Sequence, residues 1–119
     1  MAARIAIAVS RDEGLESPVD PRFGRAAAFV LTDETAEEVE VLVNPNVEAA
    51  HGAGTGSAAM LVRAGVTAVI AGEFGPKAYQ GLEGAGIAMW IGVRGKTARE
   101  LLAMLGDDEL EPMKMQVFR

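Results

Sequence analysis

The sequence contains no cysteine, and it contains a single histidine, His51, among its 119 residues. Without cysteine the chain cannot form a disulfide, a thiolate nucleophile, or an iron–sulfur or zinc site ligated by protein sulfur. With one histidine it cannot build the usual sites that use two or three imidazoles. These two absences disfavour most classes of catalytic metalloenzyme.

Long apolar runs and excess positive charge are also missing. No run approaches the roughly 18 residues of a membrane span, and the apolar run at residues 5–9 is too short for a signal peptide. We therefore expect a cytoplasmic protein with no membrane partner. Acidic residues outnumber basic ones by 17 to 11, for a net charge of −6. Because nucleic-acid binding normally needs a basic face, this balance argues against a nucleic-acid partner.

Five short apolar runs predict five β-strands. Half of the residues are apolar, so a chain of this length can bury a core and fold as one domain. The polar segment 33–38 indicates a hairpin turn between the second and third strands. The runs of Val, Ile and Ala that predict the strands cover residues 4–10, 26–32, 39–43, 66–71 and 87–91.

Three helices are expected between and after these strands. Thr55 is the predicted cap of a helix over residues 56–64, and Pro76 suits the first turn of a second over 76–83. Thr97 is expected to cap a third, which Gly106 ends. The order β-β-β-α-β-α-β-α indicates an α/β fold with a five-stranded mixed sheet whose second strand is antiparallel. We expect one domain over residues 1–106 and a charged, partly loose tail over 107–119.

This layout predicts one binding edge. Strands one, three, four and five should run in the same direction, because helical crossovers join parallel strands. The loops that follow them would then emerge together, outside the carboxyl ends of the strands, where open α/β sheets bind ligands. These loops are residues 20–25, the loop with His51, the loop with Gly75, and residues 92–96.

Two features of these loops have competing interpretations. His51 could ligate a metal as a neutral imidazole, or it could be a surface histidine with no specific role. Glycines 52, 54 and 56 precede a helix and resemble an anion cradle, although they match neither nucleotide-binding fingerprint. A plain helix-entry loop explains them equally well.

Charged residues gather at the same edge. Basic side chains there indicate anion recognition: Arg22, Arg25, Lys77, Arg94 and Lys96. Ion pairs within the loops are an equal alternative, since acidic residues fall there as well: Asp12, Glu13, Glu16, Asp20 and Glu73. No catalytic constellation is present, because the first strand carries no carboxylate and no group is specified to activate a nucleophile. We therefore expect a protein that is not an enzyme.

Several segments together resemble a known family. They read RIAIAV at 4–9, VDPRFGRA at 19–26, HGAG at 51–54, AGEFGPKA at 71–78 and AGI at 85–87. In this order they resemble the dinitrogenase iron–molybdenum cofactor biosynthesis domain over roughly residues 4–106. The two loops that contain Phe-Gly are the more specific part of the resemblance.

The resemblance implies a ribonuclease H-like fold without nuclease activity. It also implies a role in nitrogen fixation, in which relatives carry, store or deliver the anionic iron–molybdenum cofactor or its iron–sulfur precursors with protein partners in cofactor assembly. In the nitrogenase-linked members a histidine precedes the first Phe-Gly and anchors the cofactor. Arg22 stands at that position here, and an arginine does not ligate a metal but can pair with carboxylates or sulfides.

The leading hypothesis is a non-enzymatic module that holds an anionic metal–sulfur cofactor at this edge, with His51 as the metal ligand. One alternative is a sensor of an anion or small molecule that uses no metal, and a weaker one is an enzyme acting on an anionic substrate. The remaining predicted cofactor-binding residues are Arg22, Phe23, Gly24, Arg25, Gly52, Gly54, Thr55, Gly75 and Lys77.

Overall fold

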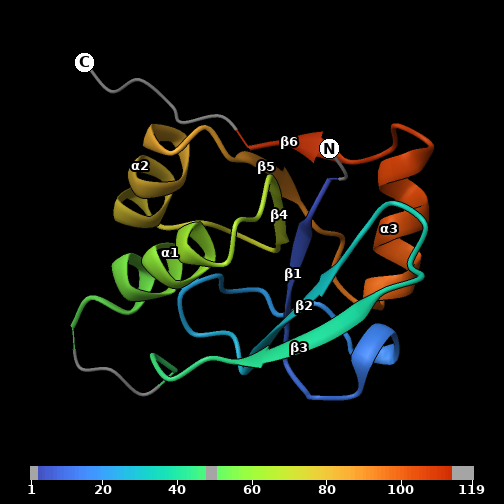
Figure 1. Ribbon diagram of the computed structural model, residues 1–119, viewed down its shortest axis with the longest axis horizontal. Coiled ribbons are helices and arrows are strands. Elements are labelled where there is room, and N and C mark those ends of the chain that lie inside the picture. The colour runs from blue at the N-terminus through green and yellow to red at the C-terminus, as the bar shows by residue number, and fades with distance from the viewer. Residues whose placement is uncertain (1–2, 48–50, 114–119) are drawn as a thin grey trace.

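The computed structural model describes residues 3–47 and 51–113. Within them, one mixed sheet has the strand order β3-β2-β1-β4-β5-β6 (Figure 1). All five predicted strands are present, but the expected total of five was wrong because a sixth pairs with β5. The strands are β1 (Ile5–Val9), β2 (Ala28–Thr32), β3 (Val39–Val43), β4 (Ala68–Ala71), β5 (Ala88–Ile91) and β6 (Glu111–Pro112).

The strand directions confirm that the predicted loops share one edge of the sheet. β1 is antiparallel to β2 and parallel to β4, β2 is antiparallel to β3, and β4 is parallel to β5. The carboxyl ends of β1, β3, β4 and β5 therefore lie at one edge of the sheet. The mixed α/β fold with an antiparallel second strand is confirmed, and its ribonuclease H-like classification stays a prediction.

Helices cover both faces of the sheet. α1 (Ala53–Arg63) and α2 (Pro76–Gly84) lie on one face, and α3 (Ala98–Gly106) and the short 3-10 helix η1 (Gly14–Glu16) lie on the other (Figure 1). β1 serves both cores, because successive side chains of a strand point to opposite faces. Ala6 and Ala8 pack toward α1 and α2, whereas Ile5, Ile7 and Val9 pack toward α3.

Of the two predicted threonine caps, one is confirmed and one was wrong. Thr97 caps α3 as expected: its hydroxyl accepts from the N–H of Glu100 at 3.2 Å, and its own N–H donates to the Glu100 carboxylate at 2.9 Å. The predicted cap Thr55 was wrong, because α1 begins earlier and Gly52 is its N-cap. Gly52 has a φ of 76°, a left-handed conformation that favours glycine, and its carbonyl accepts from the N–H of Gly56 at 2.8 Å.

The sixth strand was missed because it has only two residues and shows no alternating pattern. Its Pro112 pairs with Trp90 of β5, and its Glu111 pairs with Ile91. Nothing in the sequence of β5 indicates that a further strand pairs with it. Leu110, just before it, is buried in the core. The described part of the expected tail thus joins the sheet, and residues 114–119 lie outside the described residues. Among the described helices, none is both long and apolar enough to cross a membrane.

Candidate functional site

Three loops meet around a cavity of about 510 Å³ at the predicted edge. The loop after β1, the N-terminal turn of α1 and the segment that joins β4 to α2 each contribute residues to its wall. All the predicted site residues except His51 line it. The lining comprises Arg22, Phe23, Gly24, Arg25, Gly52, Ala53, Gly54, Thr55, Glu73, Gly75, Pro76, Lys77 and Ala78.

His51 is exposed and immediately precedes Gly52, but it is not among the residues that line the cavity. Within residues 3–47 and 51–113, no group of three or more histidine, cysteine, aspartate or glutamate side chains could hold a metal ion. The role of His51 as a metal ligand stays a prediction.

Two glycines let the loops touch each other. A Cβ on Gly24 would lie 2.8 Å from both the Cα and the backbone nitrogen of Gly54, and one on Gly72 would lie 2.5 Å from the Cα of Pro21. Real side chains do not tolerate such distances, so these glycines serve contact between backbones. The position that a Cβ of Gly24 would take is therefore occupied by α1, while Gly24 itself still lines the cavity. Gly75 differs, because nothing lies within 4 Å of the position that its Cβ would take.

Two helices begin at the cavity. α1 starts after Gly52 and α2 after Gly75, and neither N-cap residue makes a side-chain capping hydrogen bond. The first bonds of the two helices are donated by Gly56 to the Gly52 carbonyl, at 2.8 Å, and by Tyr79 to the Gly75 carbonyl, at 2.9 Å. The backbone N–H groups that precede Gly56 in α1 and Tyr79 in α2 have no partner inside their helix and carry partial positive charge. This arrangement favours an anion.

The charged side chains that line the cavity also favour an anion. Arg22, Arg25 and Lys77 line it against one acidic residue, Glu73, which leaves a formal charge of +2 in a chain of net −6. Ion pairs within the loops were the other expectation, and Asp20 does pair with Arg22, at 3.8 Å. The other three acidic residues do not line the cavity: Asp12, Glu13 and Glu16. Of the basic residues assigned to this edge, Arg94 lines a separate cavity of about 140 Å³ and Lys96 lines neither.

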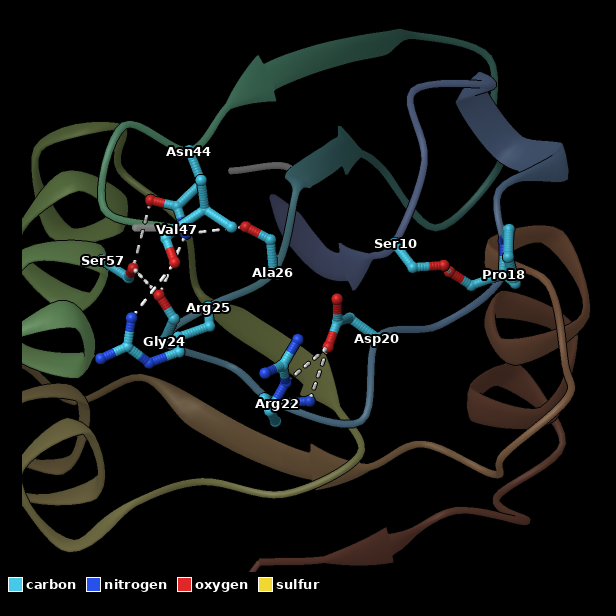
Figure 2. Close-up of polar contacts among 10 residues, drawn as sticks. All are labelled: Ser10, Pro18, Asp20, Arg22, Gly24, Arg25, Ala26, Asn44, Val47 and Ser57. Atoms are coloured by element: carbon cyan, nitrogen blue, oxygen red, sulfur yellow. Dashed lines mark hydrogen bonds and ion pairs between the residues drawn. The ribbon is translucent and has the colours of Figure 1, made fainter. Parts of the chain in front are cut away.

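Asp20 organises the turn that carries Arg22 (Figure 2). Its side chain is only 6% exposed, and it accepts the backbone N–H of Arg22 at 2.8 Å. Its own backbone is tied to two strands, since its N–H donates to Ala8 at 2.8 Å and its carbonyl accepts from Gly72 at 3.1 Å. The guanidinium of Arg22 is 3.8 Å from the carboxylate and 60% exposed, so this ion pair contributes little to stability. Asp20 fixes the backbone and leaves the guanidinium accessible.

A buried polar network holds the same loop against α1, and sequence reasoning missed it. The side-chain amide of Asn44 donates to the carbonyls of Gly24, at 3.1 Å, and Ala26, at 2.9 Å (Figure 2). The Ser57 hydroxyl lies 3.0 Å from the Gly24 carbonyl and 3.3 Å from Asn44 Oδ1. Asn44 follows a strand and reads as an ordinary turn residue, so the sequence offers no signal of this role.

The two Phe-Gly motifs form one packing unit. Phe23 is buried, and its ring stacks on that of Phe74 with the ring centroids 5.4 Å apart. The N–H of Phe23 donates to the Glu73 carbonyl at 3.1 Å, which joins the two loops through their backbones as well. Offset stacking of this kind contributes about 0.5–1.5 kcal/mol beyond area burial. The motifs therefore depend on each other structurally and fix the walls of the cavity.

Residues 1–108 match the family described as dinitrogenase iron-molybdenum cofactor. The chain belongs to this family. The apo form of the orange protein from Desulfovibrio gigas is 35% identical, with a TM-score of 0.86, over 96% of this chain and 98% of that one. A candidate NifB protein from Thermotoga, assigned to the DUF35 family, is 32% identical with a TM-score of 0.83, over 99% of this chain and 98% of its own.

A further relative, an uncharacterised protein of Methanocaldococcus jannaschii, is 33% identical over 75 residues. That match spans 60% of this chain and 64% of the relative, so it covers less than two thirds of the archaeal protein.

Proposed function

We propose that this member of the family is a non-enzymatic carrier that binds an anionic metal–sulfur cofactor, the iron–molybdenum cofactor or an iron–sulfur precursor of it. One observation carries the proposal: two helix N-termini and a formal charge of +2 surround a single cavity of about 510 Å³ in an otherwise acidic protein. The family to which the chain belongs and its similarity to the orange protein point to the same class of cargo.

The lining of the cavity indicates how the cargo would be held. It contains no histidine or cysteine, so the groups available are backbone N–H donors, Arg22, Arg25 and Lys77. An anion near a helix N-terminus gains about 0.3–1 kcal/mol, and a hydrogen bond to a charged group contributes about 1.5–3 kcal/mol. Arg22 would meet sulfide or carboxylate groups of the cargo as a charged donor. We propose coordination of a metal atom by His51 as an addition to these contacts.

Anaerobic gel filtration tests the proposal directly. The chain is mixed with isolated iron–molybdenum cofactor, and iron and molybdenum are assayed in each fraction. We expect both metals to co-elute with the protein, at about one cofactor per chain. We expect Gly75→Val to weaken co-elution, because Gly75 lines the cavity and a valine there places two methyl groups where the cargo would lie. The variant should fold, since φ at Gly75 is −72° and nothing lies within 4 Å of the position of its Cβ. Arg94→Gln, in the neighbouring cavity, is the matched control and should bind normally.

Variants of His51 and Arg22 separate the two modes of binding. His51→Ala should weaken binding if the imidazole ligates a metal atom of the cargo, and unchanged affinity would remove His51 from the site. Arg22→Gln should weaken binding through loss of a charged donor. Failure of the wild-type chain to retain either metal would contradict the carrier function.

The second candidate is a regulatory module that binds an anion or small molecule without metal. It is favoured by the absence of sulfur and imidazole donors from the cavity lining. Anaerobically purified protein distinguishes the two: a carrier should be coloured and contain iron, whereas a metal-free sensor should be colourless and bind an anion at the same cavity.

A further inference from the structure

Another cavity, of about 330 Å³, lies between α1 and α2. Its floor is made of small residues, since a Cβ on Gly81 would lie only 3.5 Å from the Cβ of Ala58. Thr55 and Lys77 line both this groove and the cofactor cavity. The groove is thus adjacent to the proposed binding site and is lined by residues of both helices.

The groove combines an apolar floor with unpaired positive charge. Val62 is 43% exposed beside it, and no acidic residue is among those that line it. Arg63 and Lys77 are both exposed, and within the described parts of the chain neither forms a salt bridge or a side-chain hydrogen bond. In a chain of net −6, this is a local surface that attracts a carboxylate next to an apolar side chain.

We propose that the α1–α2 groove docks a segment of the protein that receives the cargo. The segment inserts an apolar side chain over Ala58 and Gly81 beside Val62, and it pairs a carboxylate with Arg63 and Lys77. The purpose of the docking rests on the proposed carrier function, whereas the docking itself requires no bound cargo. The contact surface offers two basic residues, which suits an acidic protein segment better than a nucleic-acid backbone.

Lys77 couples docking to cargo binding. It lines both cavities, so a partner carboxylate that pairs with its ammonium group withdraws one positive charge from the cargo. Each ligand therefore weakens the affinity of the chain for the other by the same factor. Such coupling favours release of the cargo when the partner is seated.

Photo-cross-linking in the native host tests the docking surface. Val62 or Val93 is replaced, one at a time, by the photoreactive residue benzoylphenylalanine. Val93 is the matched control: it is 42% exposed, is also followed by an arginine, and lies outside the groove. We expect a protein adduct at position 62 that is absent at 93, with the cross-linked peptide of the partner containing an apolar residue next to Asp or Glu.

The partner identified in this way is then purified and titrated into the chain by calorimetry. Arg63→Glu should weaken binding about tenfold, because it replaces an attractive charge at the rim with a repulsive one. Gly75→Val, which alters the lining of the cofactor cavity and lies outside the groove, should leave partner binding unchanged, so loss of cargo binding and loss of docking are separate results. The proposal is overturned by equal cross-linking at both positions, by an adduct to a basic segment, nucleic acid or a second copy of this chain, or by normal binding of Arg63→Glu.

Discussion

Replacing Asn44 by alanine should destabilise the protein out of proportion to the size of the side chain. Asn44 is 1% exposed, and its amide nitrogen donates to two carbonyls. Its Oδ1 atom accepts from the backbone of Asn46 at 3.0 Å, from the Asn46 side chain at 3.2 Å, and from Ser57 at 3.3 Å. All of these bonds are lost in Asn44→Ala.

The size of the loss in the free energy of unfolding depends on which hydrogen-bond partners of Asn44 stay unpaired in the variant. The Gly24 carbonyl keeps its hydrogen bond from Ser57 at 3.0 Å, but the Ala26 carbonyl and the N–H of Asn46 lose the partner that Asn44 supplied. An unsatisfied buried polar group costs about 1–3 kcal/mol, so the two together predict a loss of about 2–6 kcal/mol. This is a large fraction of the roughly 5–15 kcal/mol that stabilises a typical domain.

Urea unfolding measures the loss, with Asn46→Ala as the graded control. Asn46→Ala removes one side-chain donor and leaves Asn44 with its other partners, so we expect it to cost about 0.5–1.5 kcal/mol. The midpoint should shift without a change in slope, since the surface exposed on unfolding is almost the same. A loss below about 1 kcal/mol for Asn44→Ala, or equal losses for both variants, would refute the reasoning.

Three further predictions rest on single contacts. Gly24→Ala should cost about 1–3 kcal/mol in urea unfolding, because its Cβ would overlap the backbone of Gly54; Gly75→Ala, which enters open space, is the control that should be near neutral. Thr32→Val should raise the thermal midpoint, since the buried Thr32 hydroxyl has no hydrogen-bond partner among the described residues, and a lower midpoint would contradict this. Hydrogen bonds from Thr97, the cap of α3, lower the pKa of Glu100 below its ordinary 4.5. The stability that this carboxylate contributes is therefore present above pH 4.5 and is lost as the pH falls through the lowered pKa. In thermal unfolding at acidic pH, Glu100→Gln should flatten the pH dependence of the midpoint temperature.

The sequence was informative about elements and directions. The apolar runs predicted five strands and the antiparallel hairpin, and the helical crossovers predicted which strands run parallel. The cap Thr97 was read correctly, because its partner Glu100 is only three residues away. The predicted start of α1 was wrong, because its N-cap Gly52 adopts a left-handed conformation that no side-chain pattern indicates. Sequence reasoning could thus place the site at a sheet edge, but not its walls.

The sequence by itself determined where the candidate site lies and which ligand atoms it lacks. It has no cysteine and one histidine, it carries two Phe-Gly loops, and its strand order brings those loops to one edge, all of which can be read from local pattern and composition. Tertiary structure alone decided what each residue does there. It paired the Gly24 and Gly54 backbones, buried Asn44 beneath the loop, and left His51 outside the cavity lining. Contacts between residues far apart in sequence depend on how loops pack in three dimensions, and such packing leaves no periodic trace in one dimension.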